Sequence, residues 1–88
     1  MPDYSITFAR SARKELEKIP PQFATRILEK IENLVFGPRP IGSLKLKGED
    51  NLWRIRIGDY RVIYEIDDFK HCIDVTVIRH RKDVYRDY

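Results

Sequence analysis

The sequence predicts a single α+β domain over residues 1–88, in which an antiparallel sheet carries two N-terminal helices on one face. Apolar residues recur at helical spacing between residues 12 and 35, whereas from residue 43 onward they alternate with polar residues. Runs of helix followed by runs of strand are typical of α+β folds. The expected element order is β-α-α-β-β-β-β, and the other face of such a sheet can stay open to water or a ligand.

The N-terminal part should form one strand and two helices. Residues 4–8 (YSITF) alternate and are rich in β-formers, which indicates a first strand. Ser11 is expected to cap a helix over residues 12–19, which Pro20 and Pro21 end. A second helix should begin near Pro21. It carries an apolar stripe typical of a helix face packed on a sheet, formed by Phe23, Ile27, Ile31 and Leu34 and widened by Leu28 and Val35.

A loop rich in Gly and Pro ends the second helix, and beyond it the apolar period changes to two. Segment 43–47 (SLKLK) should be a strand that places its leucines on one side and Lys45 and Lys47 on the other. A last strand is expected over residues 72–78 (CIDVTVI), and it leads into the polar tail at 79–88 (RHRKDVYRDY). The tail should therefore lie near one end of the sheet.

Residues 52–57 (LWRIRI) and 60–66 (YRVIYEI) should form a hairpin around a two-residue turn at Gly58 and Asp59. A turn of this length with Gly first suits a tight hairpin. In the expected register, Ile57 lies opposite Tyr60. The core face then holds Trp53, Ile55, Ile57, Tyr60, Val62 and Tyr64.

The other face of this hairpin holds Arg54, Arg56 and Arg61, with Arg56 directly opposite Arg61. Like charges directly opposite each other destabilise a sheet by roughly a few tenths of a kcal/mol. Burial of each apolar side chain gives roughly 1.5–3 kcal/mol, so the core outweighs this repulsion and holds the register. The arginines are thus tolerated, but tolerance alone does not explain why no residue relieves their repulsion.

A bound anion would explain the arginines. Guanidinium groups are planar, permanently charged and able to bind phosphate oxygens in pairs. Together with Lys45 and Lys47 on the expected neighbouring strand, they would form a positive surface of about the size of a phosphate. The alternative is a solvated basic face whose partners are Glu65, Asp59 or Asp74, and the residues alone leave both interpretations open.

The tail adds candidate residues to this surface, namely His80, Arg81, Lys82 and Tyr85. Histidine and tyrosine can move protons, and nearby cations would lower the pKa of both. Arginines can stabilise the extra negative charge that develops when a phosphodiester is attacked. Together these residues predict a site that cleaves a phosphodiester without a metal.

Composition excludes several other classes of function. The formal net charge is +3 and the isoelectric point is near 9.1, which is compatible with an anionic partner. The single Cys72 allows no internal disulfide, and one Cys with two His residues makes a zinc site unconvincing. There is no apolar run of membrane-spanning length and no signal-peptide pattern at the start. We expect a cytoplasmic protein with no membrane association and no cofactor.

Three segments resemble the RelE/ParE superfamily of bacterial toxins: LKLKG at 44–48, LWRIRIGDYRVIY at 52–64 and VIRHRKDVY at 77–85. The resemblance extends along nearly the whole chain and implies the compact α+β fold shared with microbial RNases. Its RelE branch implies an endoribonuclease, or mRNA interferase, that cuts mRNA in the 30S A site of the ribosome. In that family the 2′-hydroxyl of the message attacks the adjacent phosphate, and no metal is needed.

The resemblance also implies roles for individual residues. Arg61 matches the arginine of the family on that strand, and Arg81 matches the tail arginine credited with stabilising the transition state. Tyr85 matches a tyrosine proposed as general base or as a stacking surface. Arg54 and Arg56 stand where well-known RelE proteins have lysines. Because arginine does not exchange protons, proton transfer here would fall to Tyr85, His80 or water.

Members of this superfamily are encoded beside an antitoxin, so the resemblance implies a cognate RelB-like antitoxin as a protein partner, in addition to mRNA on the ribosome. A basic toxin suits an acidic, partly disordered antitoxin segment. Two other functions remain open. The ParE branch implies inhibition of DNA gyrase without nuclease activity, and the same arginines would also serve a catalytically inactive domain that binds RNA or protein.

Overall fold

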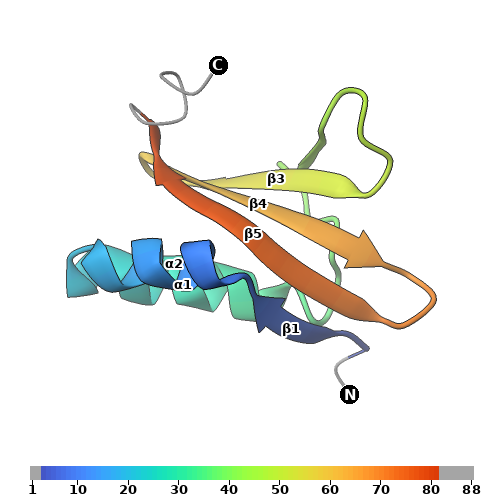
Figure 1. Ribbon diagram of the computed structural model, residues 1–88, viewed down its shortest axis with the longest axis horizontal. Coiled ribbons are helices and arrows are strands. Elements are labelled where there is room, and N and C mark those ends of the chain that lie inside the picture. The colour runs from blue at the N-terminus through green and yellow to red at the C-terminus, as the bar shows by residue number, and fades with distance from the viewer. Residues whose placement is uncertain (1–2, 82–88) are drawn as a thin grey trace.

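The computed structural model describes residues 3–81, which form two helices and a five-stranded sheet (Figure 1). The expected α+β class and element order are confirmed. The elements are β1 (Ser5–Phe8), α1 (Arg10–Lys18), α2 (Pro21–Asn33), β2 (Leu44–Lys45), β3 (Leu52–Ile57), β4 (Tyr60–Asp67) and β5 (Cys72–His80). Two of the candidate site residues, Lys82 and Tyr85, lie outside the described residues.

The sheet is mixed rather than wholly antiparallel. Its strand order is β1-β5-β4-β3-β2, and β2 to β5 pair antiparallel in turn, as expected. The first strand, however, pairs parallel with the last strand, with Ser5 opposite Cys72 and Phe8 opposite Val75. A parallel pair needs a long connection, and here both helices and three strands intervene between its members.

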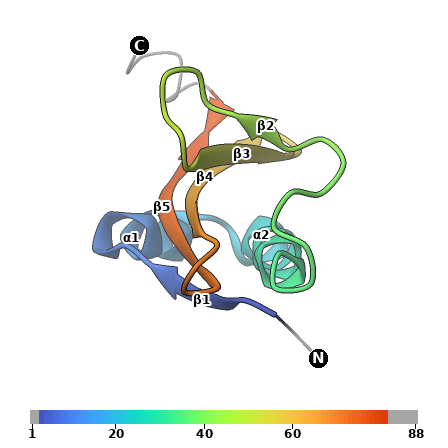
Figure 2. The ribbon, with the colours of Figure 1, turned by 90° about the vertical axis from the view of Figure 1, so that its right-hand side faces the viewer.

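The helices end and begin at the prolines that the sequence indicates. Ile19 ends α1, and α2 starts with Pro21 in its first turn, where the missing N–H costs nothing. The expected cap at Ser11 is wrong, because α1 begins at Arg10 and Ala9 occupies the cap position without a side-chain hydrogen bond. Both helices lie below β3, β4 and β5 in Figure 1, with α1 beside β5 and α2 toward β3 (Figure 2).

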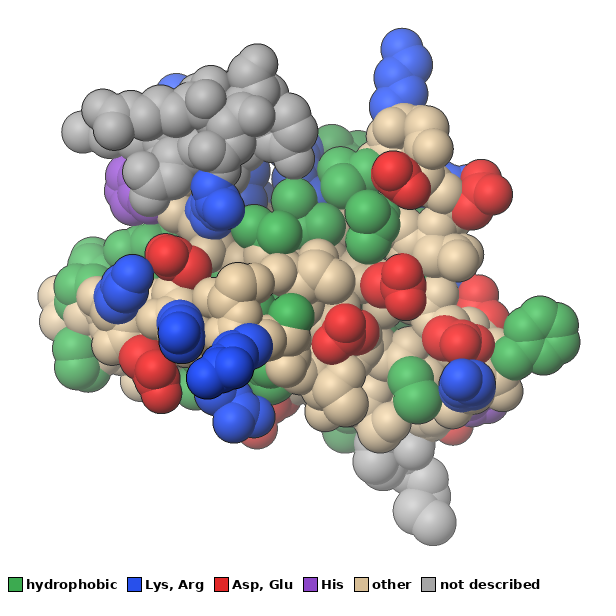
Figure 3. Space-filling model, viewed as in Figure 1, with side chains coloured by type: hydrophobic (Ala, Val, Ile, Leu, Met, Phe, Trp, Pro, Cys, Tyr) green, Lys and Arg blue, Asp and Glu red, His purple; other side chains and the backbone are tan. Residues whose placement is uncertain are grey.

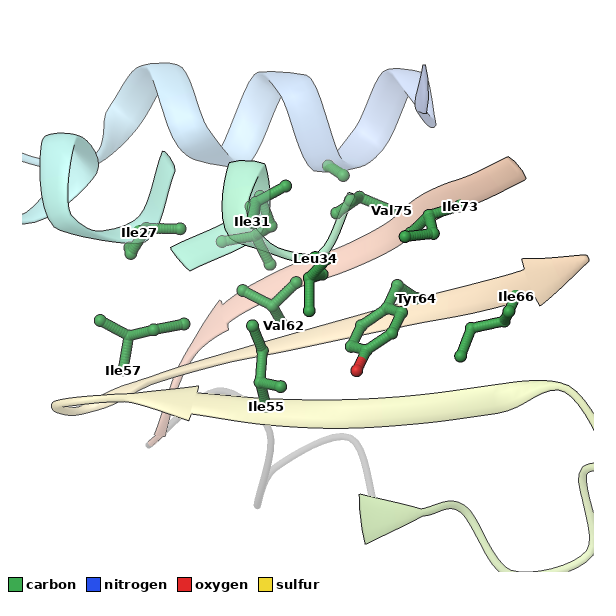
Figure 4. Packing of buried hydrophobic residues seen from close by; sticks show 12 residues of the cluster. Ile27, Ile31, Leu34, Ile55, Ile57, Val62, Tyr64, Ile66, Ile73 and Val75 are labelled. Carbon is green, nitrogen blue, oxygen red and sulfur yellow. The ribbon is translucent and has the colours of Figure 1, made fainter. Parts of the chain in front are cut away.

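The core lies between the helices and the strands (Figure 4). The apolar stripe of α2 is buried as predicted at Ile27, Ile31 and Leu34. Its first member, Phe23, remains 39% exposed, because the first turn of α2 lies at the end of the sheet near Tyr60. The inward-facing strand residues are Ile55, Ile57, Val62, Tyr64, Ile66, Ile73, Val75 and Ile78. At roughly 1.5–3 kcal/mol for each large apolar side chain, this burial dominates the stability of the domain.

The last strand is longer than expected and contains a β-bulge. It runs to His80, and its register with β4 shifts where Ile63 pairs with Val77 but Tyr64 pairs with Val75. Thr76 is the extra residue, and its hydroxyl donates a hydrogen bond of 3.1 Å to the carbonyl of Ile63. A bulge of one residue reverses which face the following side chains take.

Candidate functional site

The β3–β4 hairpin has the register predicted from the sequence. Ile57 lies opposite Tyr60 and Arg56 opposite Arg61, around a turn in which Gly58 has a positive φ of 58°. The apolar partners face the core, and Arg54, Arg56 and Arg61 take the face that the helices do not cover. We call this the open face.

A third arginine completes a row across the open face. Arg79 of β5 lies opposite Arg61 of β4, which in turn lies opposite Arg56 of β3. We call these three residues the arginine row. Cα atoms of directly paired residues on adjacent strands lie only about 4.5–5.5 Å apart, so long side chains from neighbouring strands reach a common ligand.

Arg79 was not among the residues predicted from the sequence. The expected strand ended at residue 78, and simple alternation from Ile73 and Val75 would have placed Arg79 on the core face. The bulge at Thr76 reverses that alternation and brings Arg79 to the open face beside Arg61.

The rest of the open face changes from basic to acidic along the strands. Beyond the arginine row, Arg54, Ile63 and Val77 lie opposite one another. One step further along the sheet, Glu65 lies opposite Asp74, whose carboxylate accepts a hydrogen bond of 2.8 Å from Thr7. Acidic side chains gather on the half of the molecule near the β4–β5 turn (Figure 3). A polyanion would therefore be attracted to one end of the open face and repelled at the other.

The arginine row is suited to hold a phosphate group. Arg56 is exposed, Arg61 and Arg79 are half-buried, and the Nε atom of Arg61 is itself buried. Partial burial lowers the local dielectric and strengthens attraction to an anion. Such an arrangement can stabilise negative charge that develops on a phosphate under attack.

The predicted place of Lys45 is wrong. It lies opposite Trp53, on the side of the sheet that faces the core, and Leu44 lies opposite Arg54 on the open face instead. Only two residues of the expected 43–47 strand pair with β3, so the register of this edge depends on the loop that follows. Lys47 lies in that loop with an exposed side chain.

Of the candidate tail residues, the structure describes His80 and Arg81. His80 lies at the expected end of the sheet, but it is opposite Tyr60 on the core side, with the two ring centroids 5.2 Å apart. The expectation that it shares a face with the arginines is therefore wrong. Arg81 is exposed, and its backbone N–H donates a 2.6 Å hydrogen bond to the carbonyl of Asp59, which places it beside the β3–β4 turn.

A separate polar cluster ties the opposite end of the molecule together. Asp68 accepts hydrogen bonds of 2.8 Å from Arg39 and from the hydroxyl of Tyr4, and Tyr4 stacks on His71. The hydrogen bond from Arg39 lowers the pKa of Asp68, and the hydrogen bond to Asp68 raises the pKa of Tyr4. Arg39 also lies 5.2 Å from the ring centroid of Trp53. This cluster anchors the loop after α2 and lies far along the sheet from the arginine row.

Within residues 3–81, no three His, Cys, Asp or Glu side chains are grouped so that they could hold a metal ion. Over the same residues, neither helix has the length and apolar character needed to cross a membrane.

Comparison with known sequences identifies a family. The model of the ParE toxin of the type II toxin–antitoxin system parDE matches residues 6–85. Toxin RelG of Mycobacterium tuberculosis is 32% identical over 88 residues, covering 94% of this chain and 97% of that protein. Toxin RelE of the same organism is 30% identical, covering 94% of this chain and 87% of that protein.

Solved structures show the same fold. A chain of the archaeal RelE–RelB complex from Pyrococcus horikoshii OT3 superimposes with a TM-score of 0.81 at 30% identity, covering 90% of this chain and 96% of that chain. The isolated RelE toxin of E. coli gives a TM-score of 0.79 at 25% identity, covering 96% of this chain and 93% of that chain.

Proposed function

Because this chain belongs to the family of ParE toxins of type II toxin–antitoxin systems, as a RelE-like member, we propose that it is an mRNA endoribonuclease that acts in the ribosomal A site. The 2′-hydroxyl oxygen of a nucleotide forms a bond to the adjacent phosphorus while the bond to the 5′-oxygen breaks. The products are a 2′,3′-cyclic phosphate and a 5′-hydroxyl end. One proton leaves the 2′-hydroxyl and one reaches the departing oxygen.

The arginine row is the observation that carries this proposal. Three arginines occupy directly paired positions on three adjacent strands, at the basic end of a face whose other end is acidic. We assign Arg56, Arg61 and Arg79 to binding the scissile phosphate and stabilising the charge that develops on it. No metal is invoked, because the row itself supplies the positive charge.

Residues near the row complete the proposed site. Arg81, beside the β3–β4 turn, is assigned to the same phosphate, and Arg54 to a neighbouring one. Lys47 and Lys82 are proposed to contact phosphates of the message on either side of the scissile one. Tyr85 is proposed to move a proton, as the family resemblance implies, with water as the alternative. The ribosome would hold the message in the geometry needed for attack.

We also propose a cognate RelB-like antitoxin as the physiological partner. Solved relatives of similar fold include RelE–RelB complexes from Pyrococcus horikoshii OT3 and Methanococcus jannaschii. A basic toxin with net charge +3 would attract an acidic antitoxin segment.

Mapping of RNA ends in cells tests the proposed activity. The toxin is induced without its antitoxin, and the 5′-hydroxyl ends of cellular RNA are sequenced. Cuts confined to translated codons and in frame are expected, and they should disappear in Arg61→Ala and Arg81→Ala variants. Undiminished cleavage and toxicity in both variants would remove the site assignment.

Inhibition of DNA gyrase is the second candidate function, because the matching family model is described as a ParE toxin. The same induction experiment separates the two candidates. Intact messages with stalled replication would favour gyrase. Retained RNA binding with neither toxicity nor cleavage would indicate an inactive binding domain.

A further inference from the structure

A cavity of about 270 Å³ lies at the same end of the sheet as the arginine row, but on the helix side. It opens between the first turns of α2 and the β3–β4 turn, which lie at one end of the molecule (Figure 1). Its floor is apolar and includes Ile27 of α2 and Ile57 of β3. The proposed cleavage chemistry makes no use of this cavity.

Aromatic rings form one wall of the cavity. The centroids of Phe23 and Tyr60 are 6.0 Å apart, and those of Tyr60 and His80 are 5.2 Å apart. Phe23 is the one member of the apolar stripe of α2 that stays 39% exposed. A large ring left partly exposed beside Tyr60 offers a stacking surface for a flat ligand.

Polar side chains border the same cavity. Arg26 of α2 is exposed and brings hydrogen-bond donors, and Asp59 of the turn is exposed and brings acceptors. Unpaired nucleobases are bound in proteins by stacking on aromatic rings and by hydrogen bonds to their edges. The combination of ring faces, a guanidinium and a carboxylate around a small cavity therefore fits a single base better than a helix or a long aliphatic chain.

The cavity and the arginine row are joined by the strands themselves. Each strand contributes an arginine to the open face and the adjacent residue to the cavity. These pairs are Arg56 with Ile57, Arg61 with Tyr60 and Arg79 with His80. Successive residues of a strand are only about 3.3 Å apart, so a nucleic-acid strand that passes over the β3–β4 turn can reach both surfaces.

We propose that this cavity holds one unpaired nucleobase of an RNA strand whose nearby phosphate lies against the arginine row. The site rests on the proposed function and extends it to recognition of the substrate. It would give the toxin a preference at one position of the message that the arginines, which contact only phosphate, cannot supply.

Stacking of a fluorescent base tests the site directly. The probe is a short single-stranded RNA with 2-aminopurine placed at each position in turn, titrated with the full 88-residue chain. The variants are Phe23→Ala, Phe23→Tyr, which keeps a ring, and Arg61→Ala. The control is Phe36→Ala, because Phe36 is also exposed, at 68%, but follows the far end of α2. The thermal midpoint of each variant reports its folding.

The wild-type chain should quench 2-aminopurine strongly at one position. Phe23→Ala should remove that quenching and weaken RNA binding by about 5- to 150-fold, the range measured for loss of one stacked base. Phe23→Tyr and Phe36→Ala should behave as wild type. Arg61→Ala should weaken binding of every probe equally.

Several results would overturn the assignment. Unchanged quenching in Phe23→Ala would show that no base stacks in the cavity, and so would an equal loss of quenching in Phe36→Ala. The same conclusion would follow if the wild-type chain quenched 2-aminopurine equally at every position. Weaker antitoxin binding with unchanged RNA binding in Phe23→Ala would assign the cavity to a protein partner. None of these results alters the RNA ends mapped in cells, so the proposed cleavage stands or fails separately.

Discussion

Replacing Arg61 with methionine removes the central charge of the arginine row while keeping a long apolar stem. Arg61 lies between Arg56 and Arg79, so it takes part in two like-charge pairs, whereas each outer arginine takes part in one. At about 0.2–1 kcal/mol for each cross-strand pair, relief of this repulsion in Arg61→Met should contribute about 0.4–2 kcal/mol to the free energy of unfolding. Arg56→Met should raise it by about half as much. Cleavage should meanwhile fall by about 100- to 1,000-fold, the usual cost of losing one donor to a developing anion.

Urea denaturation at low and high salt measures this gain. Salt at 1 M shortens the screening length to about 3 Å, so the difference between Arg61→Met and wild type should shrink. Arg13→Met, on an exposed position of α1, controls for the change of residue type. A stability gain equal to that of Arg56→Met would refute the inference that charge repulsion within the arginine row destabilises the fold. A gain that persists unchanged at 1 M salt would also refute it.

Three further changes test the fold and the open face. Tyr64→Phe leaves the buried carbonyl of Pro38 without its 2.7 Å hydrogen bond and should cost about 1–3 kcal/mol in urea denaturation. Burial raises the pKa of Tyr64 from 10.0 to about 12, so stability that is present below pH 10 should be lost as the pH rises through 12. The loss should be on the order of a few kcal/mol, and Tyr64→Phe should lack it. Glu65→Lys should tighten binding of single-stranded RNA in a filter-binding assay and steepen the salt dependence of that binding. Glu17→Lys on α1 is the control, and equal effects of the two substitutions would contradict RNA binding at the open face. Gly58→Ala should lower the urea midpoint, with a loss of about 1–2 kcal/mol in the free energy of unfolding, because φ is 58° at this position. An unchanged midpoint would contradict the left-handed backbone conformation assigned to the turn.

The hairpin could be predicted in full because its information is local. Only one register fits the hairpin, because any slip by one residue would bury arginines. The two-residue turn, the strict alternation and the matching lengths of the two apolar faces all specify this register. Burial of Ile55, Ile57 and Val62 confirms that alternation sets the faces. Alternation alone therefore suffices to assign three of the candidate residues, Arg54, Arg56 and Arg61, to the correct face.

The expected face of His80 was wrong because one residue reverses the alternation. Without the bulge at Thr76, strict alternation would place His80 on the open face and Arg79 on the core face. A bulge depends on how two strands twist against each other, and a strand pattern read alone does not contain it.

Pairings that depend on distant or very short segments could not be read from the sequence. The parallel pairing of β1 with β5 joins segments separated by the whole of the domain, so alternation within either strand says nothing about direction. The pairing of β2 rests on two residues at the sheet edge, and their register placed Lys45 on the core side. Edge strands are held by few contacts, which weakens the link between pattern and face.

The geometry of the candidate site is fixed by the core rather than by the site itself. Arg56, Arg61 and Arg79 carry like charges at paired positions, so their charges do not themselves favour this alignment. Each is adjacent in the chain to a core-side residue of the same strand, and slipping the register would expose Val62 and Ile78, which are fully buried. The burial of two such side chains, at roughly 1.5–3 kcal/mol each, exceeds the repulsion of the row, at about 0.2–1 kcal/mol for each pair. The alignment of charges is therefore available to a ligand before the ligand arrives, and an anion that binds there gains from charges already brought together by the core.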